Sequence, residues 1–214
     1  MIQIENISEI KKHISNLRAV IFDLDDTLYP LNEYVQSGFR QISRLFLGHS
    51  QEVYDQLWEA YVGQDTVDAG SVDTESVVVK PADTAPADAN PAVTGAIHSM
   101  LQAQGLDTDE MAEKCLRIYE QHRPNIHPYD GVVELLQELR EKGILLGLLI
   151  DGPAEMQREK LRALGIIPLF HEIIITDDIA GHGDVSKFRK PNPICFEIMR
   201  LRLDVEAEQM GYVG

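Results

Sequence analysis

An apolar run at residues 19–22 ends in two aspartates, Asp23 and Asp25, which are separated by one residue and followed by Thr27. Because side chains alternate along a strand, both carboxylates start on the same side as the chain leaves the sheet. The carboxyl end of a buried strand is where open α/β sheets bind their ligands. Two carboxylates this close are costly unless a cation or a function keeps them there. The segment therefore predicts an α/β fold with a site at the end of a central strand.

Paired carboxylates of this kind suit phosphoryl transfer. One carboxylate attacks phosphorus, and the other gives a proton to the leaving oxygen and later takes one from water. A hard divalent cation, most often Mg²⁺, reduces the repulsion between the carboxylates and the phosphate. The alternatives are a calcium loop and a plain polar turn. A calcium loop would need Gly and Glu where Leu28 and Tyr34 stand, and a plain turn would not need the apolar strand before it.

The hydrophobic pattern alternates between strands and helices in the order of a parallel α/β unit. Short apolar runs predict strands, and apolar positions at helical spacing predict helices. The fold class that follows is a three-layer, Rossmann-like parallel sheet. The expected strands are 19–24, 144–150 and 173–175, and the expected helices are 5–17, 35–46, 51–62, 93–104, 108–122, 132–142, 155–164 and 193–202.

A helical insertion separates the first two expected strands. We expect a discontinuous core formed by residues 1–29 and 127–214, with residues 30–126 as an inserted helical unit. Within it, residues 64–94 are rich in Asp, Ala, Val, Thr and Pro and lack periodicity, which predicts a disordered acidic insert. An insertion directly after a catalytic loop is a typical position for a lid.

Composition limits the classes of partner. The formal net charge of −16 over 214 residues argues against nucleic-acid binding and against attachment to anionic membranes. No signal peptide is apparent, and the longest apolar run is too short to span a bilayer. The two cysteines, Cys115 and Cys195, lack metal-type spacing. We therefore expect a cytoplasmic protein that acts on a small molecule, and the oligomeric state stays open.

The Asp23–Thr27 segment resembles the first motif of the haloacid dehalogenase-like (HAD) hydrolases, a superfamily dominated by phosphatases. The resemblance implies that Asp23 is the nucleophile, Asp25 the general acid/base and Thr27 a supporting residue at the phosphate site. It also implies Mg²⁺ bound by Asp23 and by Asp25 through its main-chain carbonyl, and a helical cap over a small phosphorylated metabolite. Dehalogenases of the family lack an acid/base at the position of Asp25, so this residue favours phosphate chemistry.

A second segment, residues 147–153, extends the resemblance but departs from it at one position. Similar sequences end this strand in Ser or Thr, then Asn or Asp, then Gly. Here Ile150 stands at the hydroxyl position, followed by Asp151 and Gly152. Their backbone N–H groups can still bind a phosphoryl group. The loss of one preorganised donor typically costs about 10²–10³ in rate. The alternative interpretation is that Ile150 is a buried strand residue that contributes packing alone.

A third segment contains Lys190 followed by Pro191, just ahead of an expected helix. It resembles the family's lysine motif, which implies that Lys190 neutralises the charge of the nucleophile and of the phosphoryl group. Lys187 and Arg189, close by, are expected to be solvated or at most to touch substrate.

The end of the sequence departs most from the family pattern. Residues 212–214 resemble the start of a strand that leads to an acidic Mg²⁺-binding motif, and the sequence stops one residue before the expected Asp. We expect this to remove the strand beside strand 19–24 and to expose an edge. A fragment, a degenerate protein or a strand supplied by a partner would explain it. The first function that stays open is a Mg²⁺-dependent phosphatase. The alternative is a catalytically impaired HAD-like binding or structural domain, or a fragment of a larger polypeptide. A phosphotransferase or mutase is a third, less favoured alternative.

Overall fold

A computed structural model describes residues 1–4, 10, 16–65, 90–181 and 183–214 of the chain. The chain forms two compact units, one made of Met1–Tyr34 and Arg123–Gly214 and the other of Val35–His122. The sequence-based boundaries fell at 29/30 and 126/127, a few residues from these divisions. The two units are described separately below.

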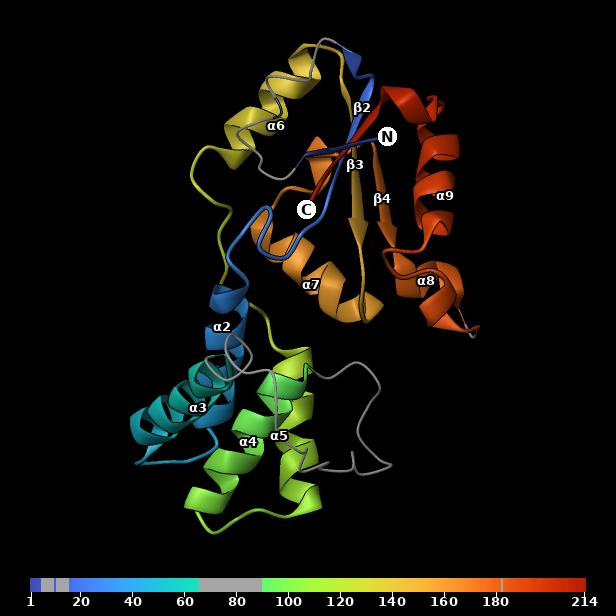
Figure 1. Cartoon of the computed structure of the whole chain (residues 1–214). Helices are drawn as coiled ribbons and strands as arrows, with labels where there is room; N and C mark the ends of the chain where they lie inside the picture. The colour runs from blue at the N-terminus through green and yellow to red at the C-terminus, as the bar shows by residue number, and fades with distance from the viewer. Residues whose placement is uncertain (5–9, 11–15, 66–89, 182) are drawn as a thin grey trace, which may run out of the picture. The chain divides into compact units, whose positions relative to one another are not determined.

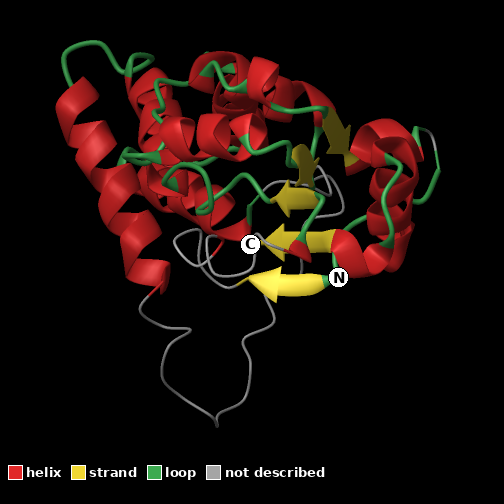
Figure 2. Cartoon of the chain, turned by 90° about the horizontal axis from the view of Figure 1, so that it is seen from above, coloured by secondary structure: helices red, strands yellow, loops and turns green. Residues whose placement is uncertain are grey.

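The first unit is built on a five-stranded parallel sheet with the strand order β1-β5-β2-β3-β4. Figure 2 shows the strands side by side. All four residues of β2 are buried, because β3 and β5 flank this strand and helices cover the sheet. The predicted parallel α/β fold is confirmed. The strands are β1 (Ile2–Ile4), β2 (Ala19–Phe22), β3 (Leu145–Ile150), β4 (Glu172–Ile175) and β5 (Met210–Val213).

Helices lie on both faces of this sheet, which makes three layers. Figure 1 shows α6 and α9 on opposite sides of β3, and both helices contact that strand. Asn192 caps α9 by accepting from the Ile194 N–H at 3.1 Å, and Pro193 fills the first turn. The helices are α6 (Val132–Glu141), α7 (Ala154–Leu164), α8 (Thr176–Ala180) and α9 (Pro193–Leu203), with 3₁₀ turns η3 (Ile167–Leu169), η4 (Val185–Lys187) and η5 (Ala207–Gln209).

Close packing under α9 depends on a glycine in β3. A Cβ atom at Gly147 would lie 2.8 Å from both Ile21 Cδ1 and Met199 Sδ. The missing side chain therefore lets α9 approach the sheet. The buried cluster formed there contains Ala19, Ile21, Leu149, Ile174, Cys195, Met199, Leu203, Val205, Met210 and Tyr212.

The expected loss of the strand beside 19–24 is wrong. β5 pairs with β2 from Ala19↔Met210 to Phe22↔Val213, and β1 covers the other edge of β5. Four consecutive buried residues, Met210–Val213, are enough to complete this part of the sheet. The strand β1 was not predicted. Most of expected helix 5–17 and most of insert 64–94 lie outside the described residues.

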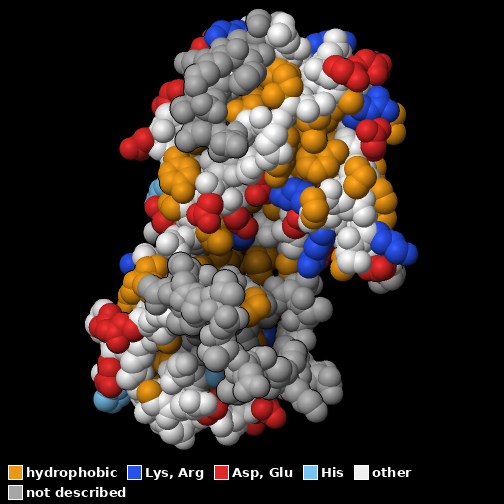
Figure 3. All heavy atoms as spheres, in the orientation of Figure 1, with side chains coloured by type: hydrophobic (Ala, Val, Ile, Leu, Met, Phe, Trp, Pro, Cys, Tyr) orange, Lys and Arg blue, Asp and Glu red, His pale blue; other side chains and the backbone are white. Residues whose placement is uncertain are grey.

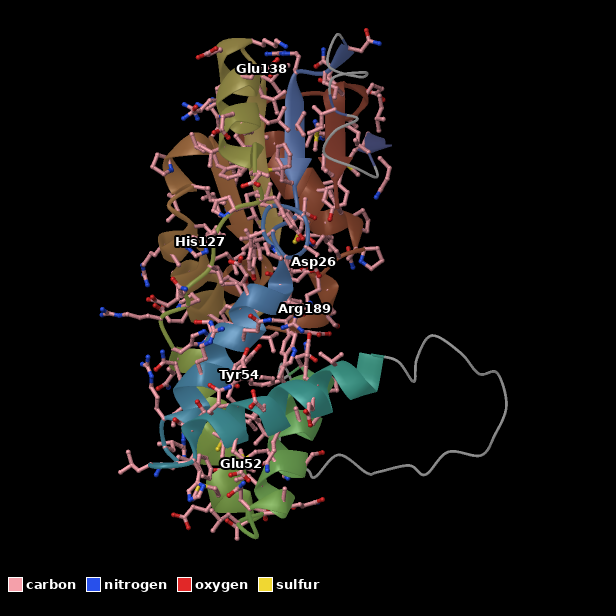
Figure 4. The ribbon with its side chains drawn as sticks, turned by 90° about the vertical axis from the view of Figure 1, so that its left-hand side faces the viewer. Asp26, Glu52, Tyr54, His127, Glu138 and Arg189 are labelled. Atoms are coloured by element: carbon pink, nitrogen blue, oxygen red, sulfur yellow. The ribbon has the colours of Figure 1, made fainter. Side chains whose placement is uncertain are left out.

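The second unit is a helical bundle whose core includes an aromatic cluster. Phe39 contacts the rings of Tyr61 and Tyr119, with centroid separations of 5.9 and 6.2 Å. Arg40 lies over the ring of Tyr54, one of two α3 residues labelled in Figure 4. None of the described helices is long and apolar enough to cross a membrane. The helices are α2 (Leu31–Ser43), which begins in the first unit, α3 (Ser50–Asp65), α4 (Pro91–Ala103) and α5 (Asp109–Gln121).

Candidate active site

The loop that follows β2 borders a cleft of about 470 Å³ within the first unit. The cleft lies at the carboxyl ends of β2 and β5, where ligands of open α/β sheets bind. Its lining is strongly acidic, which suits a cation or a cation-bound ligand. The loop contributes Asp23, Asp25, Asp26 and Thr27, the segment ahead of and within α6 contributes Tyr129, Asp130, Gly131, Val132 and Leu135, and the end of β5 contributes Val213 and Gly214.

Backbone hydrogen bonds hold this loop in place. The Asp23 N–H donates to the Val213 carbonyl at 2.8 Å, which continues the β2–β5 ladder by one residue. Asp26, labelled in Figure 4, has a left-handed backbone with φ 56°, and its Oδ1 accepts from the Leu31 N–H at 2.9 Å. Aspartate tolerates this conformation better than most residues do. The acidic loop is therefore a turn that its own hydrogen bonds hold in place, and it begins directly at the end of β2.

Asp23 forms an ion pair with Lys190, as the sequence predicted. The Lys190 Nζ lies 2.5 Å from Asp23 Oδ1 and 3.2 Å from the Leu149 carbonyl. Burial acts to lower the pKa of Lys190, but the Asp23 carboxylate, with Tyr212 and Asp151, raises it above its ordinary value. The lysine is therefore charged at neutral pH and offsets the charge of the aspartate.

The side chain of Asp151 holds the segment that carries Lys190. Its carboxylate accepts from the Lys190 backbone N–H at 3.1 Å. Burial raises the pKa of Asp151, and the charge of Lys190 and the hydroxyl of Thr176 offset this only in part. The carboxylate thus fixes Lys190, the ion-pair partner of Asp23, through its backbone. The predicted donation from the Asp151 and Gly152 N–H groups to a phosphate stays a prediction.

The turn after β3 requires its glycine. Gly152 has φ 116°, and a Cβ atom there would lie 2.9 Å from Gln157 Nε2. That amide donates to the Asp151 carbonyl at 3.0 Å and ties the turn to α7. Ile150 is buried at 1% exposure and pairs with Ile175 in the sheet. The position therefore supplies packing and no hydroxyl group.

Asp25 has two partners that the sequence analysis did not identify. Lys160 Nζ lies 2.8 Å from Oδ1 and 2.9 Å from Oδ2 of Asp25. The Tyr29 hydroxyl donates to Oδ1 at 2.5 Å. One signal for Lys160 was present, because it shares the apolar face of α7 with Leu161 and Leu164. A lysine on a buried face is rare unless it is paired.

Two arginines near this site form ion pairs with aspartates. Arg189, labelled in Figure 4, lies 3.1 Å from Asp177 Oδ2, so it is paired and not merely solvated. Arg158 bonds Asp178 at 2.6 Å. Figure 3 shows basic side chains interspersed with acidic ones on the visible face of this unit.

The oxygen donors of the loop fit a small hard cation. Mg²⁺ is commonly held by one or two carboxylates together with waters and phosphate oxygens. Asp23 and Asp25 offer carboxylate and carbonyl oxygens of this type. Among the described residues, no group of three or more His, Cys, Asp or Glu side chains is arranged to hold a metal.

Comparison with known proteins agrees with these motifs. Residues 17–214 match the model of the haloacid dehalogenase-like hydrolase family. The chain is 29% identical over 207 residues to a glyceraldehyde 3-phosphate phosphatase of Methanopyrus kandleri, covering 92% of this chain and 75% of that protein. It is 30% identical over 186 residues to the mouse N-acylneuraminate-9-phosphatase, covering 86% and 68%.

Solved structures share the fold. The HAD-hydrolase YfnB from Bacillus subtilis, determined with magnesium bound, aligns with a TM-score of 0.59 at 19% identity and covers 92% of this chain and 77% of that one. A predicted phosphoglycolate phosphatase from Haemophilus somnus aligns with a TM-score of 0.54 at 19% identity, covering 93% of this chain and 77% of that one.

Proposed function

The chain belongs to the haloacid dehalogenase-like hydrolases, and on that premise we propose that it is a Mg²⁺-dependent phosphatase that hydrolyses a small phosphorylated metabolite through an aspartyl-phosphate on Asp23. The observation that carries the proposal is the Asp23–Lys190 pair at the mouth of the sheet, with Asp25 in the same cleft. The phosphatase names of the curated relatives support the reaction class.

The proposed reaction has two steps, and each has a role for the residues described. In the first, an Asp23 carboxylate oxygen attacks phosphorus, the phosphorus–ester oxygen bond breaks, and the leaving oxygen takes its electron pair and a proton from Asp25. In the second, water attacks the aspartyl-phosphate and gives its proton to Asp25, and the bond from phosphorus to Asp23 breaks. Lys190 offsets negative charge throughout.

The same proposal assigns the remaining groups of the site. Asp23 and the main-chain carbonyl of Asp25 would hold Mg²⁺, which supplies electrostatic stabilisation of the phosphoryl group when it is bound. Thr27 and the backbone N–H groups of Asp151 and Gly152 would bind the phosphate. The magnesium in the YfnB structure supports the choice of metal.

The cap, the classes of partner and the cellular location are further parts of the proposal. We infer that the helical unit Val35–His122 acts as the cap over the substrate. Neither nucleic acid nor a membrane is among the proposed partners, in line with the net charge of −16. Cys115 and Cys195 are free, buried thiols, and burial raises the pKa of Cys115 to about 11. Unreactive reduced thiols support a cytoplasmic location.

The experiment that tests the proposal removes the nucleophile while keeping its shape. We expect Asp23→Asn to abolish Mg²⁺-dependent hydrolysis of p-nitrophenyl phosphate, because an amide oxygen is a poor nucleophile. Asp204→Asn is the matched control, since Asp204 lies in the left-handed turn that ends α9, away from the cleft. The control should keep wild-type turnover.

Two results would contradict the proposal in different ways. Equal turnover by wild type and Asp23→Asn would refute the covalent route. A wild-type protein without turnover, and without Mg²⁺-dependent binding of beryllium fluoride, would favour the alternative of a binding domain.

A further inference from the structure

A lysine is buried on the inner face of α7, close to the candidate active site. Lys160 is 3% exposed, and its Nζ lies 4.5 Å from the centroid of the Tyr34 ring. A buried ammonium group is costly unless it is paired and hydrogen-bonded. Its partner is the carboxylate of Asp25.

The contacts to the two oxygens of Asp25 are unequal. Oδ1 accepts from both Tyr29 Oη, at 2.5 Å, and Lys160 Nζ, at 2.8 Å. Oδ2 accepts from Lys160 Nζ at 2.9 Å. A carboxylate oxygen has two acceptor positions. These contacts fill both positions on Oδ1 and one on Oδ2.

The two residues that hold the Asp25 carboxylate come from different elements. Tyr29 belongs to the loop that also carries Asp25, whereas Lys160 projects from α7, 135 residues further along the chain. Gln157, one turn earlier on the same helix, bonds the Asp151 carbonyl in the turn after β3. The inner face of α7 therefore braces two loops at the end of the sheet.

We propose that Lys160 is a positioning residue that, with Tyr29, fixes the rotamer of Asp25 and leaves Oδ2 as the oxygen that transfers the proton. This inference rests on the proposed function, because it assigns a role within the same reaction. In the first step the breaking phosphorus–oxygen bond leaves its electron pair on the ester oxygen, which takes the proton from Asp25 Oδ2. In the second step Oδ2 takes a proton from the attacking water.

A general acid must lie within about 2.6–3.2 Å of the atom that it protonates. An Asp25 side chain without its anchors can rotate away from the leaving oxygen. The consequence depends on the substrate. A leaving group that is stable as an anion needs little protonation, whereas a basic leaving group needs the acid in place.

The test compares two aryl phosphates that differ in the leaving group. We expect Lys160→Met to lower kcat/KM for phenyl phosphate about 10–10²-fold while lowering kcat/KM for p-nitrophenyl phosphate far less. Lys160→Arg should restore part of the phenyl phosphate activity, because arginine can also bond both carboxylate oxygens. If the role of Lys160 were purely structural, kcat/KM would fall equally for both substrates.

Lys142→Met is the matched control. Lys142 is an exposed lysine that also pairs with a carboxylate, Glu138, at 2.7 Å, but it lies at the far end of α6. We expect Lys142→Met to leave kcat/KM unchanged for both substrates. Tyr29→Phe provides a second test, which removes the uncharged partner of Asp25 and remains usable if Lys160→Met does not fold. It should lower kcat/KM for phenyl phosphate more than kcat/KM for p-nitrophenyl phosphate, as expected for Lys160→Met.

The outcomes distinguish a failure of the proposed function from a failure of this inference alone. A wild-type protein inactive on both esters overturns the proposed function and this inference with it. An active wild type whose Lys160→Met and Tyr29→Phe variants keep the wild-type ratio of the two substrates overturns this inference alone. A larger loss on phenyl phosphate, with recovery in Lys160→Arg, supports it.

Discussion

Lys190 combines a short contact to Asp23 with a backbone that is itself held by Asp151. This arrangement places one fixed positive charge beside the proposed nucleophile. A preorganised charge of this kind stabilises a transition state without reorganisation.

We predict that Lys190→Met lowers kcat/KM for p-nitrophenyl phosphate by about 10²–10³, because nothing then offsets the charge that develops beside Asp23. Steady-state kinetics with Mg²⁺ measure this. Lys187→Met, three residues earlier on an exposed turn, is the control and should behave like wild type. A loss of less than a few-fold in the Lys190 variant would remove this residue from the proposed machinery.

Residues of the site differ in how far the sequence could predict them. Asp23 and Lys190 stand in motifs at strand ends and before a helix, so their meeting follows from the parallel topology. The role of Lys160 could not be predicted in the same way, because its position in α7 says only that it faces inward. Asp151 was predicted at the site, but the attachment of its side chain to the Lys190 backbone depends on a turn conformation that no local pattern specifies.

At the scale of the elements, β3 and β4 are joined by a histidine that acts as part of the ladder. The His171 N–H donates to the Leu146 carbonyl at 2.8 Å, and the Leu146 N–H donates to His171 Nδ1 at 2.9 Å. Partial burial and the charge of Arg140 lower the pKa of His171. The neutral ring is therefore the form that the folded protein prefers.

Acid should weaken this junction. Because the folded state binds the proton less readily than the unfolded chain, the contribution of His171 is complete above the ordinary histidine pKa of about 6.5 and is lost as the pH falls below it. We predict that wild type loses more stability than His171→Asn between neutral pH and mildly acidic pH, since asparagine keeps an acceptor but does not titrate. Urea unfolding at several pH values measures the difference. A constant difference across the range would contradict the prediction.

A glycine in α2 is required by the packing of the helical unit. A Cβ atom at Gly38 would overlap Tyr119 Cδ2 and lie 2.7 Å from Cε2, and the aromatic ring cannot bend away. We predict that Gly38→Ala lowers the free energy of unfolding by about 1–3 kcal/mol, although alanine favours helices.

Gly63→Ala is the matched control in α3, where a Cβ atom would meet none of the described atoms outside its own stretch of helix within 4 Å. Helix propensity alone should make this variant more stable, by up to about 1 kcal/mol. Thermal and urea unfolding of both variants check the pair. Stabilisation of both would show that Tyr119 moves without cost.

The elements were predicted more completely than their edges. The order of strands and helices follows from periodicity, because long apolar runs and helical spacing are strong signals. β1 and β5 are short, with three and four residues, and their pairing depends on contacts with distant parts of the chain. This is why the sequence analysis did not predict β1 and expected β5 to be missing.

At the scale of the whole molecule, the chain is strongly acidic, with 35 Asp and Glu residues against 19 Lys and Arg residues. A negative field attracts divalent cations and repels phosphate esters that carry no metal. The acidic loop after β2 lies within that field. Both its own carboxylates and the net negative charge of the molecule therefore favour the binding of a cation there.

We predict that treatment with EDTA abolishes hydrolysis of p-nitrophenyl phosphate and that added MgCl₂ restores it. CaCl₂ should restore much less, because the larger Ca²⁺ prefers more protein ligands than this loop offers. EDTA saturated beforehand with Mg²⁺ is the control and should have no effect. Full turnover in EDTA would show that the reaction needs no metal.

The hydrogen bond from the Asp23 amide to Val213 gives the protein a natural spectroscopic reporter. That amide proton exchanges with deuterium only when the last pair of the β2–β5 ladder opens. A single resonance, followed over time in heavy water, would therefore show how often the backbone hydrogen bond of Asp23, the proposed nucleophile, opens, without any substrate being present.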